Sequence, residues 1–204
     1  MTAAVATAVR GLGRLQPART VFFACDVQER FRDMIHCMPH VIATSQFLVK
    51  AAKEMQIPCV VTEQYPKGLL HTVKEIDVSG LPVFEKTKFS MLTDEVNAHL
   101  ATLGEERRTA VVFGIEAHVC VFQTCLDLVD SGWDVHVVAD GVSSSKKLNR
   151  DVALERLKQA GVWVTSAESL LFDLMRDTSY PHFKAISGLV KDQNSVLKGL
   201  SASL

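Results

Sequence analysis

With 204 residues, 48% of them hydrophobic and 22% charged, the chain is long enough for one domain with a large buried core. Its formal net charge of -1 argues against the broad basic surface with which proteins bind nucleic acid. No apolar run approaches the length of about 20 residues that crosses a bilayer, so a membrane-spanning protein is not expected.

The N-terminal segment differs from the rest, because residues 1–19 contain three arginines and the first acidic residue is Asp26. An arginine-containing, acid-free start is typical of mitochondrial transit peptides, and a short leader without a targeting role is the alternative. We expect a leader over 1–19, one domain over 20–191 and a polar, frayed tail over 192–204. Five cysteines without a C-x-x-C pair favour a reducing compartment, cytoplasmic or mitochondrial.

Apolar runs that suit buried strands alternate with segments whose apolar residues have helical spacing. The strands are expected at residues 20–27, 57–62, 81–85, 109–115, 133–139 and 162–166. The helices are expected at 39–55, 92–103, 118–131, 149–160, 168–176 and 182–191, with loops at 63–73 and 140–147. This alternation predicts an α/β protein with three layers, α/β/α, and a mostly parallel central sheet.

The reactive side chains follow the predicted strands. Asp26, Gln64, Lys86 and Cys120 lie at or just after strand ends, and the carboxyl ends of parallel strands share one edge of the sheet, where ligands bind. Cys120 stands at a strand-to-helix turn, and a helix N-terminus can activate a thiol. A carboxylate such as Asp26 can then act as general base, and a nearby lysine such as Lys86 favours the thiolate.

Each of these residues also has a purely structural interpretation. Free cysteines are often small core residues, an acid at a strand end can cap a helix or form an ion pair, and loop lysines are usually solvated. A phosphatase with Asp26 as nucleophile is disfavoured, because Gln28 stands where that chemistry needs a second aspartate.

Several motifs together resemble one family. The segments CDVQ, EKTKFS and GIEAHVC resemble the isochorismatase-like cysteine hydrolases, and TEQYPKGL, LDLVDSG and VHVVADGVSS resemble their isochorismatase domain-containing subgroup. The resemblance extends over residues 21–191. It implies a catalytic triad of Asp26, Lys86 and Cys120, a cis peptide at 115–116, and an oxyanion hole from the backbone N–H groups of Glu116 and Cys120.

The chain also departs from relatives of that family. Nicotinamidases carry an Asp-x-His metal site after the second strand, and EQYPKGL stands there instead, so no metal and no cofactor are expected. Glu116 occupies a position where many of the family's hydrolases have a small residue. We expect Gln28, Gln64, Tyr65 and Glu116 to contact the substrate.

These observations predict a hydrolase that attacks an amide or similar carbonyl of a small molecule through a Cys120 thioester. The alternative is a weak or inactive homologue that serves as an oligomeric scaffold or binding protein. The family resemblance implies a homo-oligomer, with an interface expected on the helix at 171–175 or on the C-terminal helix. Neither membrane nor nucleic-acid partners are expected.

Overall fold

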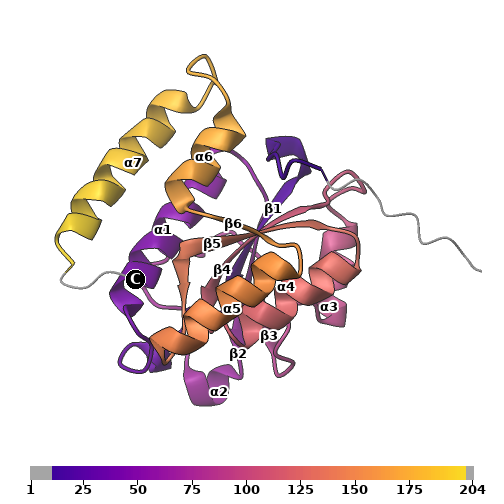
Figure 1. Cartoon of the computed structure of the whole chain (residues 1–204), viewed down its shortest axis with the longest axis vertical. Coiled ribbons are helices and arrows are strands. Elements are labelled where there is room, and N and C mark those ends of the chain that lie inside the picture. The colour runs from indigo at the N-terminus through magenta and orange to yellow at the C-terminus, as the bar shows by residue number, and fades with distance from the viewer. Residues whose placement is uncertain (1–10, 201–204) are drawn as a thin grey trace, which may run out of the picture.

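A computed structural model describes residues 11–200 as a six-stranded sheet between two layers of helices (Figure 1). Its strands are all parallel and follow the order β3-β2-β1-β4-β5-β6. Their bounds are β1 Thr20–Cys25, β2 Cys59–Gln64, β3 Val83–Lys86, β4 Thr109–Ile115, β5 Asp134–Ser143 and β6 Trp163–Thr165. The α/β/α architecture that the sequence predicts is therefore confirmed.

The helices cover both faces of this sheet (Figure 1). Their bounds are α1 Met38–Glu54, α2 Pro66–Leu69, α3 Asp94–Ala101, α4 Cys120–Asp130, α5 Lys147–Gln159, α6 Ala167–Met175 and α7 Phe183–Lys198. Helices α1, α6 and α7 lie on one face, and α3, α4 and α5 lie on the other.

The side chains of strand β1 pack against the helices on both faces of the sheet. All six of its residues are buried, because it lies at the centre of the sheet between β2 and β4. Phe22 and Ala24 belong to the core beneath α1, whereas Phe23 and Cys25 belong to the core beneath α4. The alternation of side chains along a strand thus explains why β1 is apolar throughout.

Three sequence predictions about loops and ends are wrong. The loop expected at 63–73 contains the end of β2 and helix α2, which starts with Pro66 at a position that suits proline. The first half of the loop expected at 140–147 is strand, because β5 resumes its pairing with β4 after an irregularity and ends at Ser143. Helix α7 continues through 192–198, where the sequence suggested a frayed tail, because residues such as Ile186 anchor its inner side in the core.

The sequence also suggested an exposed apolar face on the helix at 171–175, and most of its apolar residues are buried instead. Leu171, Leu174 and Met175 are buried in the core beneath α6 and do not form an exposed patch. Phe172 is the exposed apolar residue of that segment.

The last part of the expected leader contacts the domain. Leu15 is buried, its N–H donates to Asp173 Oδ2 at 2.9 Å, and its carbonyl accepts from Arg176 Nη2 at 2.8 Å. Residues 1–10, the first half of the segment on which the targeting prediction rests, and residues 201–204 lie outside the described part of the chain. Within residues 11–200, no helix is both long and apolar enough to cross a membrane.

Candidate active site at the carboxyl end of the sheet

A buried ion pair joins the ends of β1 and β3. Lys86 Nζ lies 2.6 Å from Asp26 Oδ2, and the exposed fractions of the two side chains are 0% and 1%. The other oxygen of the Asp26 carboxylate accepts from Thr62 Oγ1 at 2.7 Å. Charges buried to this degree are costly and cluster at functional sites, so this pair is the first sign of a site at the predicted rim.

The Lys86 ammonium is surrounded by oxygen atoms. Besides Asp26, it contacts Gln64 Oε1 at 2.6 Å and the carbonyl oxygens of Phe89 and Lys88 at 2.9 and 3.2 Å. Because an ammonium has three N–H groups, four acceptors occupy all of its protons. Lys86 is therefore held as a fixed positive charge, and it has no spare proton for another group.

The pKa of Lys86 reflects these surroundings. Burial lowers it, but the electrostatic interactions with the Cys25, Asp26 and Cys120 side chains outweigh burial, and the pKa lies above its usual value. The predicted lysine thus contacts Asp26 of the predicted triad directly and interacts electrostatically with Cys120.

Gly114 brings β4 against the end of β1. Its φ of +115° lies outside the range of ordinary L residues, and a Cβ there would clash with the carbonyl oxygen of Cys25. Glycine is therefore required at this point for the two strands to meet as they do. The Ile115–Glu116 peptide that follows is cis, as the family resemblance implies.

Cys120 is the first residue of α4, two residues later than the predicted start of that helix. The Glu116 carbonyl accepts from the N–H groups of Val119 and Val121, at 3.0 and 3.2 Å, which fixes the turn in front of the helix. Within residues 11–200, the N–H groups of Glu116 and Cys120 have no hydrogen-bond acceptor. Cys120 is 7% exposed and belongs to the buried cluster beneath α4.

Cys25, which the sequence suggested as a core residue, also belongs to this site. Its Sγ donates to Asp26 Oδ2 at 3.6 Å. Burial raises its pKa well above the usual value, and a hydrogen bond with Cys120 and the charge of Asp26 raise it further, against the opposing effect of Lys86. Its position next to Asp26 was the available sequence signal, but an apolar strand gave no reason to treat its thiol as functional.

Glu116 does not project freely beside the cysteine. Its Oε2 accepts from the Ser145 N–H at 2.7 Å and lies 3.8 Å from His118 Nδ1. The two ring nitrogens of His118 also have partners, because Nδ1 lies 2.9 Å from Ser144 Oγ and Nε2 lies 3.3 Å from Asn149 Nδ2. The glutamate is thereby tied to the start of α5.

Gln28 uses its polar side-chain atoms within the protein. It is fully buried, its Oε1 accepts from the Gln64 N–H at 2.7 Å, and its Nε2 donates to the carbonyls of Gln64 and Leu70 at 2.9 and 2.6 Å. The expectation that it lines the pocket is therefore unsupported, because all its polar atoms hold the segment after β2 in place.

Glu63 holds the same segment from the other side. Its Oε1 accepts from both the N–H and the Oγ1 of Thr72, at 2.7 and 2.8 Å, and its Oε2 lies 2.8 Å from His71 Nδ1. Burial raises the pKa of this carboxyl, but the hydrogen bonds from Thr72 and His71 outweigh it, and the pKa lies below its usual value.

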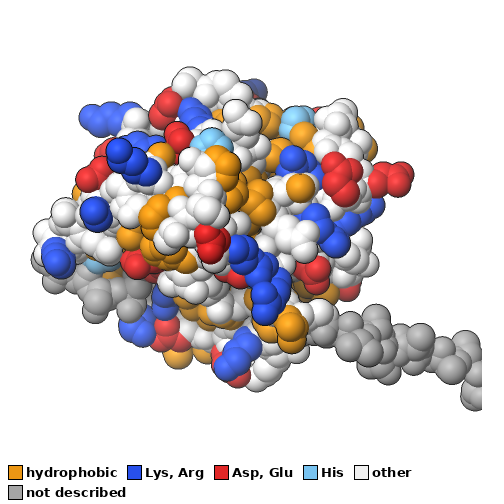
Figure 2. Space-filling view, turned by 90° about the horizontal axis from the view of Figure 1, so that it is seen from above, with side chains coloured by type: hydrophobic (Ala, Val, Ile, Leu, Met, Phe, Trp, Pro, Cys, Tyr) orange, Lys and Arg blue, Asp and Glu red, His pale blue; other side chains and the backbone are white. Residues whose placement is uncertain are grey.

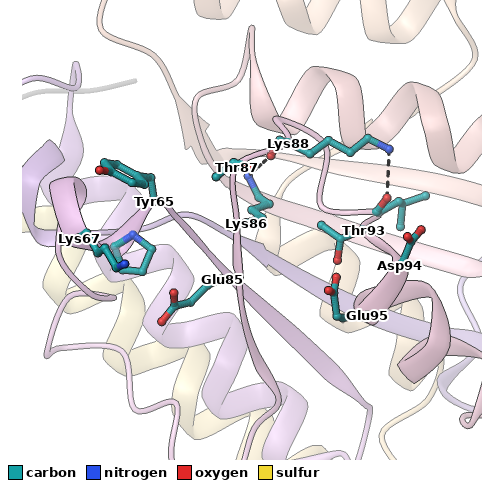
Figure 3. A pocket seen from close by; sticks show the side chains of 11 residues that line it. Tyr65, Lys67, Glu85, Lys86, Thr87, Lys88, Thr93, Asp94 and Glu95 are labelled. Atoms are coloured by element: carbon teal, nitrogen blue, oxygen red, sulfur yellow. Dashed lines mark hydrogen bonds between the residues drawn. The ribbon is translucent and has the colours of Figure 1, made fainter.

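An open cleft of about 550 Å³ lies beside the edge strand β3 (Figure 3). Tyr65 and Lys67 line one side of it, and Asp94 and Glu95 line the other. Asp26 and Cys120 do not line this cleft, and neither do the other residues expected to bind substrate, apart from Tyr65. The predicted substrate-binding residues are thus near the rim but do not share one cavity.

Residues 11–200 contain no group of three or more His, Cys, Asp or Glu side chains arranged to hold a metal ion. None of the five cysteines, all of which lie within residues 11–200, forms a disulfide. The chemistry that the rim offers is therefore that of thiol, carboxylate, ammonium and backbone N–H groups.

The fold and this rim define a three-layer α/β/α protein of the hydrolase-like kind, with Asp26 after β1, Lys86 at the end of β3 and Cys120 at the start of α4. Residues 20–169 match the family model described as "Isochorismatase domain". The chain belongs to the isochorismatase family, and its similarity to isochorismatase domain-containing proteins confirms the subgroup that the motifs indicated.

Two relatives and one solved structure illustrate the similarity. "Secreted isochorismatase effector Isc1" of Phytophthora sojae is 49% identical over 202 residues, which cover 97% of this chain and 96% of that protein. "Isochorismatase domain-containing protein 1" of Danio rerio is 48% identical over 88% of this chain, and the match spans 64% of its length. The structure of MAR1 ribonuclease from Caenorhabditis elegans has a TM-score of 0.83 and 40% identity, covering 87% of this chain and 92% of that one.

Proposed function

We propose that the protein is a cysteine hydrolase that cleaves an amide or similar carbonyl compound through a thioester on Cys120. The buried contact between Asp26 and Lys86, beside the first residue of α4, is the observation that carries this proposal. An ion pair with almost no exposure stabilises a fold less than apolar packing of the same volume does, so a functional reason for keeping it is favoured.

In the proposed mechanism Asp26 takes the proton of the Cys120 thiol. Lys86 keeps its protons and stabilises the thiolate by its charge, with help from the N-terminus of α4. The thiolate attacks the carbonyl carbon, and the oxyanion accepts hydrogen bonds from the N–H groups of Glu116 and Cys120, which have no other acceptor in the described structure. The amine leaves with the proton from Asp26, and a water that Asp26 deprotonates then hydrolyses the thioester.

The burial of the site restricts the substrate. With Cys120 7% exposed, the thiol is accessible to a small acyl group and inaccessible to a peptide strand or a folded domain. Glu116 is tied to Ser145 beside the proposed oxyanion hole, which leaves that hole open despite the large side chain. Gln64, held by Lys86, and Tyr65, which lines the neighbouring cleft, are the proposed contacts for the rest of the substrate.

Incubation with a mixed library of small amides and esters, followed by intact-protein mass spectrometry, tests this proposal. We expect an acyl adduct on Cys120 that builds up in the wild type and is absent in Cys120→Ala. Cys125→Ala is the matched control, because it removes a buried thiol from the same helix and should leave the adduct unchanged. Turnover of an identified substrate that survives Cys120→Ala would refute the mechanism.

A non-catalytic role is the competing proposal. In that case the protein would be an oligomeric scaffold with a closed site, and Cys120 would react with iodoacetamide no faster than Cys125. Exposed apolar residues at the same rim, among them Met34, Phe89 and Leu148, support a homo-oligomer in either case. Light scattering coupled to gel filtration measures that state.

Ribonuclease activity, which the Caenorhabditis elegans protein carries in its name, has less support here. Lys67 and Lys88 line the cleft beside β3 together with Glu85, Asp94 and Glu95, and these acids would repel a phosphate backbone. Acidic and basic side chains are also interspersed on the face shown in Figure 2. An RNA-degradation assay that compares the wild type with Cys120→Ala tests for this activity directly.

For localisation we retain an intracellular proposal, cytoplasmic or mitochondrial. The word "secreted" in the name of the Phytophthora relative applies to that protein. Imaging a C-terminally tagged chain with and without residues 1–10 would test whether this segment directs it to mitochondria.

A further inference from the structure

The described structure contains a second thiol beside the proposed catalytic base. Cys25 Sγ lies 3.6 Å from Asp26 Oδ2, the same oxygen that accepts from Lys86 at 2.6 Å. Cys25 and Cys120 also belong to the same buried cluster under α4, and Cys120 is among the groups that raise the pKa of Cys25. Cys25 therefore has two possible acceptors, one in the base and one in the nucleophile.

Cys25 remains protonated in these surroundings. It is fully buried, and its pKa is raised well above the usual value by burial first, then by the hydrogen bond with Cys120 and the charge of Asp26. A thiol that keeps its proton always has one hydrogen bond to donate. Before Cys120 ionises, the negatively charged acceptor is Asp26, and after the proton moves from Cys120 to Asp26, the negatively charged acceptor is Cys120.

We propose that Cys25 is a positioning residue of the reaction, whose S–H donates to Asp26 in the resting site and to the Cys120 thiolate once the proton has been transferred. The inference rests on the proposed function of Cys120 as nucleophile. Only one proton is transferred, from Cys120 Sγ to Asp26, and Cys25 keeps its own proton throughout. Since a hydrogen bond to the charged form favours that form, Cys25 makes the Cys120 thiolate easier to form.

Alkylation of Cys120 by iodoacetamide as a function of pH tests this proposal without an identified substrate. Peptide-level mass spectrometry must follow Cys120 separately, because Cys37 is partly exposed and its Sγ lies 3.3 Å from His36 Nε2. We expect Cys25→Ala to move the pH midpoint of Cys120 alkylation upward by about one unit, which makes the reaction about tenfold slower below the midpoint. Cys25→Ser, which keeps a donor, should move the midpoint back toward that of the wild type.

Cys125→Ala is the matched control, since it removes an equally buried thiol from the same cluster at a distance from Asp26. Its midpoint should equal that of the wild type. Cys25→Val fills the space of the thiol without a donor and replaces Cys25→Ala if that variant does not fold.

Two results would overturn the inference while leaving the proposed function intact. One is a wild-type midpoint in both Cys25→Ala and Cys25→Val, and the other is an equal shift in Cys125→Ala. Slow alkylation of wild-type Cys120 at every pH would instead refute the proposed function, and the inference with it.

Discussion

Replacing Lys86 by methionine should destabilise the fold strongly, because it leaves the Asp26 carboxylate buried without its counterion. The change Lys86→Met keeps most of the side-chain volume and removes the ammonium. Asp26 is 1% exposed and would retain hydrogen bonds from Thr62 and Cys25. Removing one partner of such a buried pair costs about 3–5 kcal/mol.

The melting temperature gives a second measure of the same effect. For a domain of this size each kcal/mol lowers it by about 2–4 °C, so Lys86→Met should melt about 6–20 °C below the wild type. Urea unfolding at pH 7, followed by far-ultraviolet circular dichroism, measures the free energy directly.

A double-mutant cycle separates the ion pair from general damage to the core. Asp26→Asn is the appropriate second change, because Asp26 has a φ of +51° and asparagine tolerates this left-handed conformation. The double variant carries no buried charge and should be more stable than the sum of the two single losses predicts, by about 2 kcal/mol or more. Purely additive losses, or a loss below about 1 kcal/mol for Lys86→Met alone, would refute the assigned ion pair.

Three further changes test other parts of the described structure. Burial lowers the pKa of His136 to about 4, so below about pH 6.5 the unfolded chain binds a proton that the folded chain excludes. The free energy of unfolding should therefore fall by about 3 kcal/mol between pH 6.5 and 4 because of this residue. His136→Phe should abolish that loss, which urea unfolding at the two pH values measures. Gly114→Ala should destabilise by about 3 kcal/mol more than Gly132→Ala, because both glycines have positive φ but nothing lies within 4 Å of a Cβ at Gly132. Gln28→Ala should lower the free energy of unfolding by about 2–4 kcal/mol and expose residues 65–73 to proteolysis. Gln46→Ala, which removes a single hydrogen bond, should not expose them.

Each of these predictions has a result that contradicts it. A His136→Phe protein that loses as much stability in acid as the wild type would mean that this imidazole does not drive the loss. Equal effects of alanine at Gly114 and Gly132 would contradict the close approach of β4 to β1. An intact 65–73 segment in Gln28→Ala would leave Gln28 free for a role other than anchoring.

Much of the architecture was predictable from the sequence, because it depends on local patterns. Apolar runs of strand length alternate with helical spacing, and this alternation leads to parallel strands whose carboxyl ends share an edge. Asp26 and Lys86 were placed on that edge by their positions at the ends of two strands, and the structure puts them 2.6 Å apart. The position of Cys120 at the start of a helix followed from Gly114 and the change of period after it.

The partners of each side chain were decided by the tertiary structure. The Gln28 side chain forms hydrogen bonds with backbone groups of Gln64 and Leu70, and the Glu116 carboxylate accepts one from the Ser145 N–H. Sequence position alone did not indicate these partners. These bonds join residues 29 to 42 positions apart, and no local pattern specifies them. Cys25 is the clearest case, because strand alternation determines that it is buried, and only the tertiary structure places its thiol against the Asp26 carboxylate and in the same cluster as Cys120.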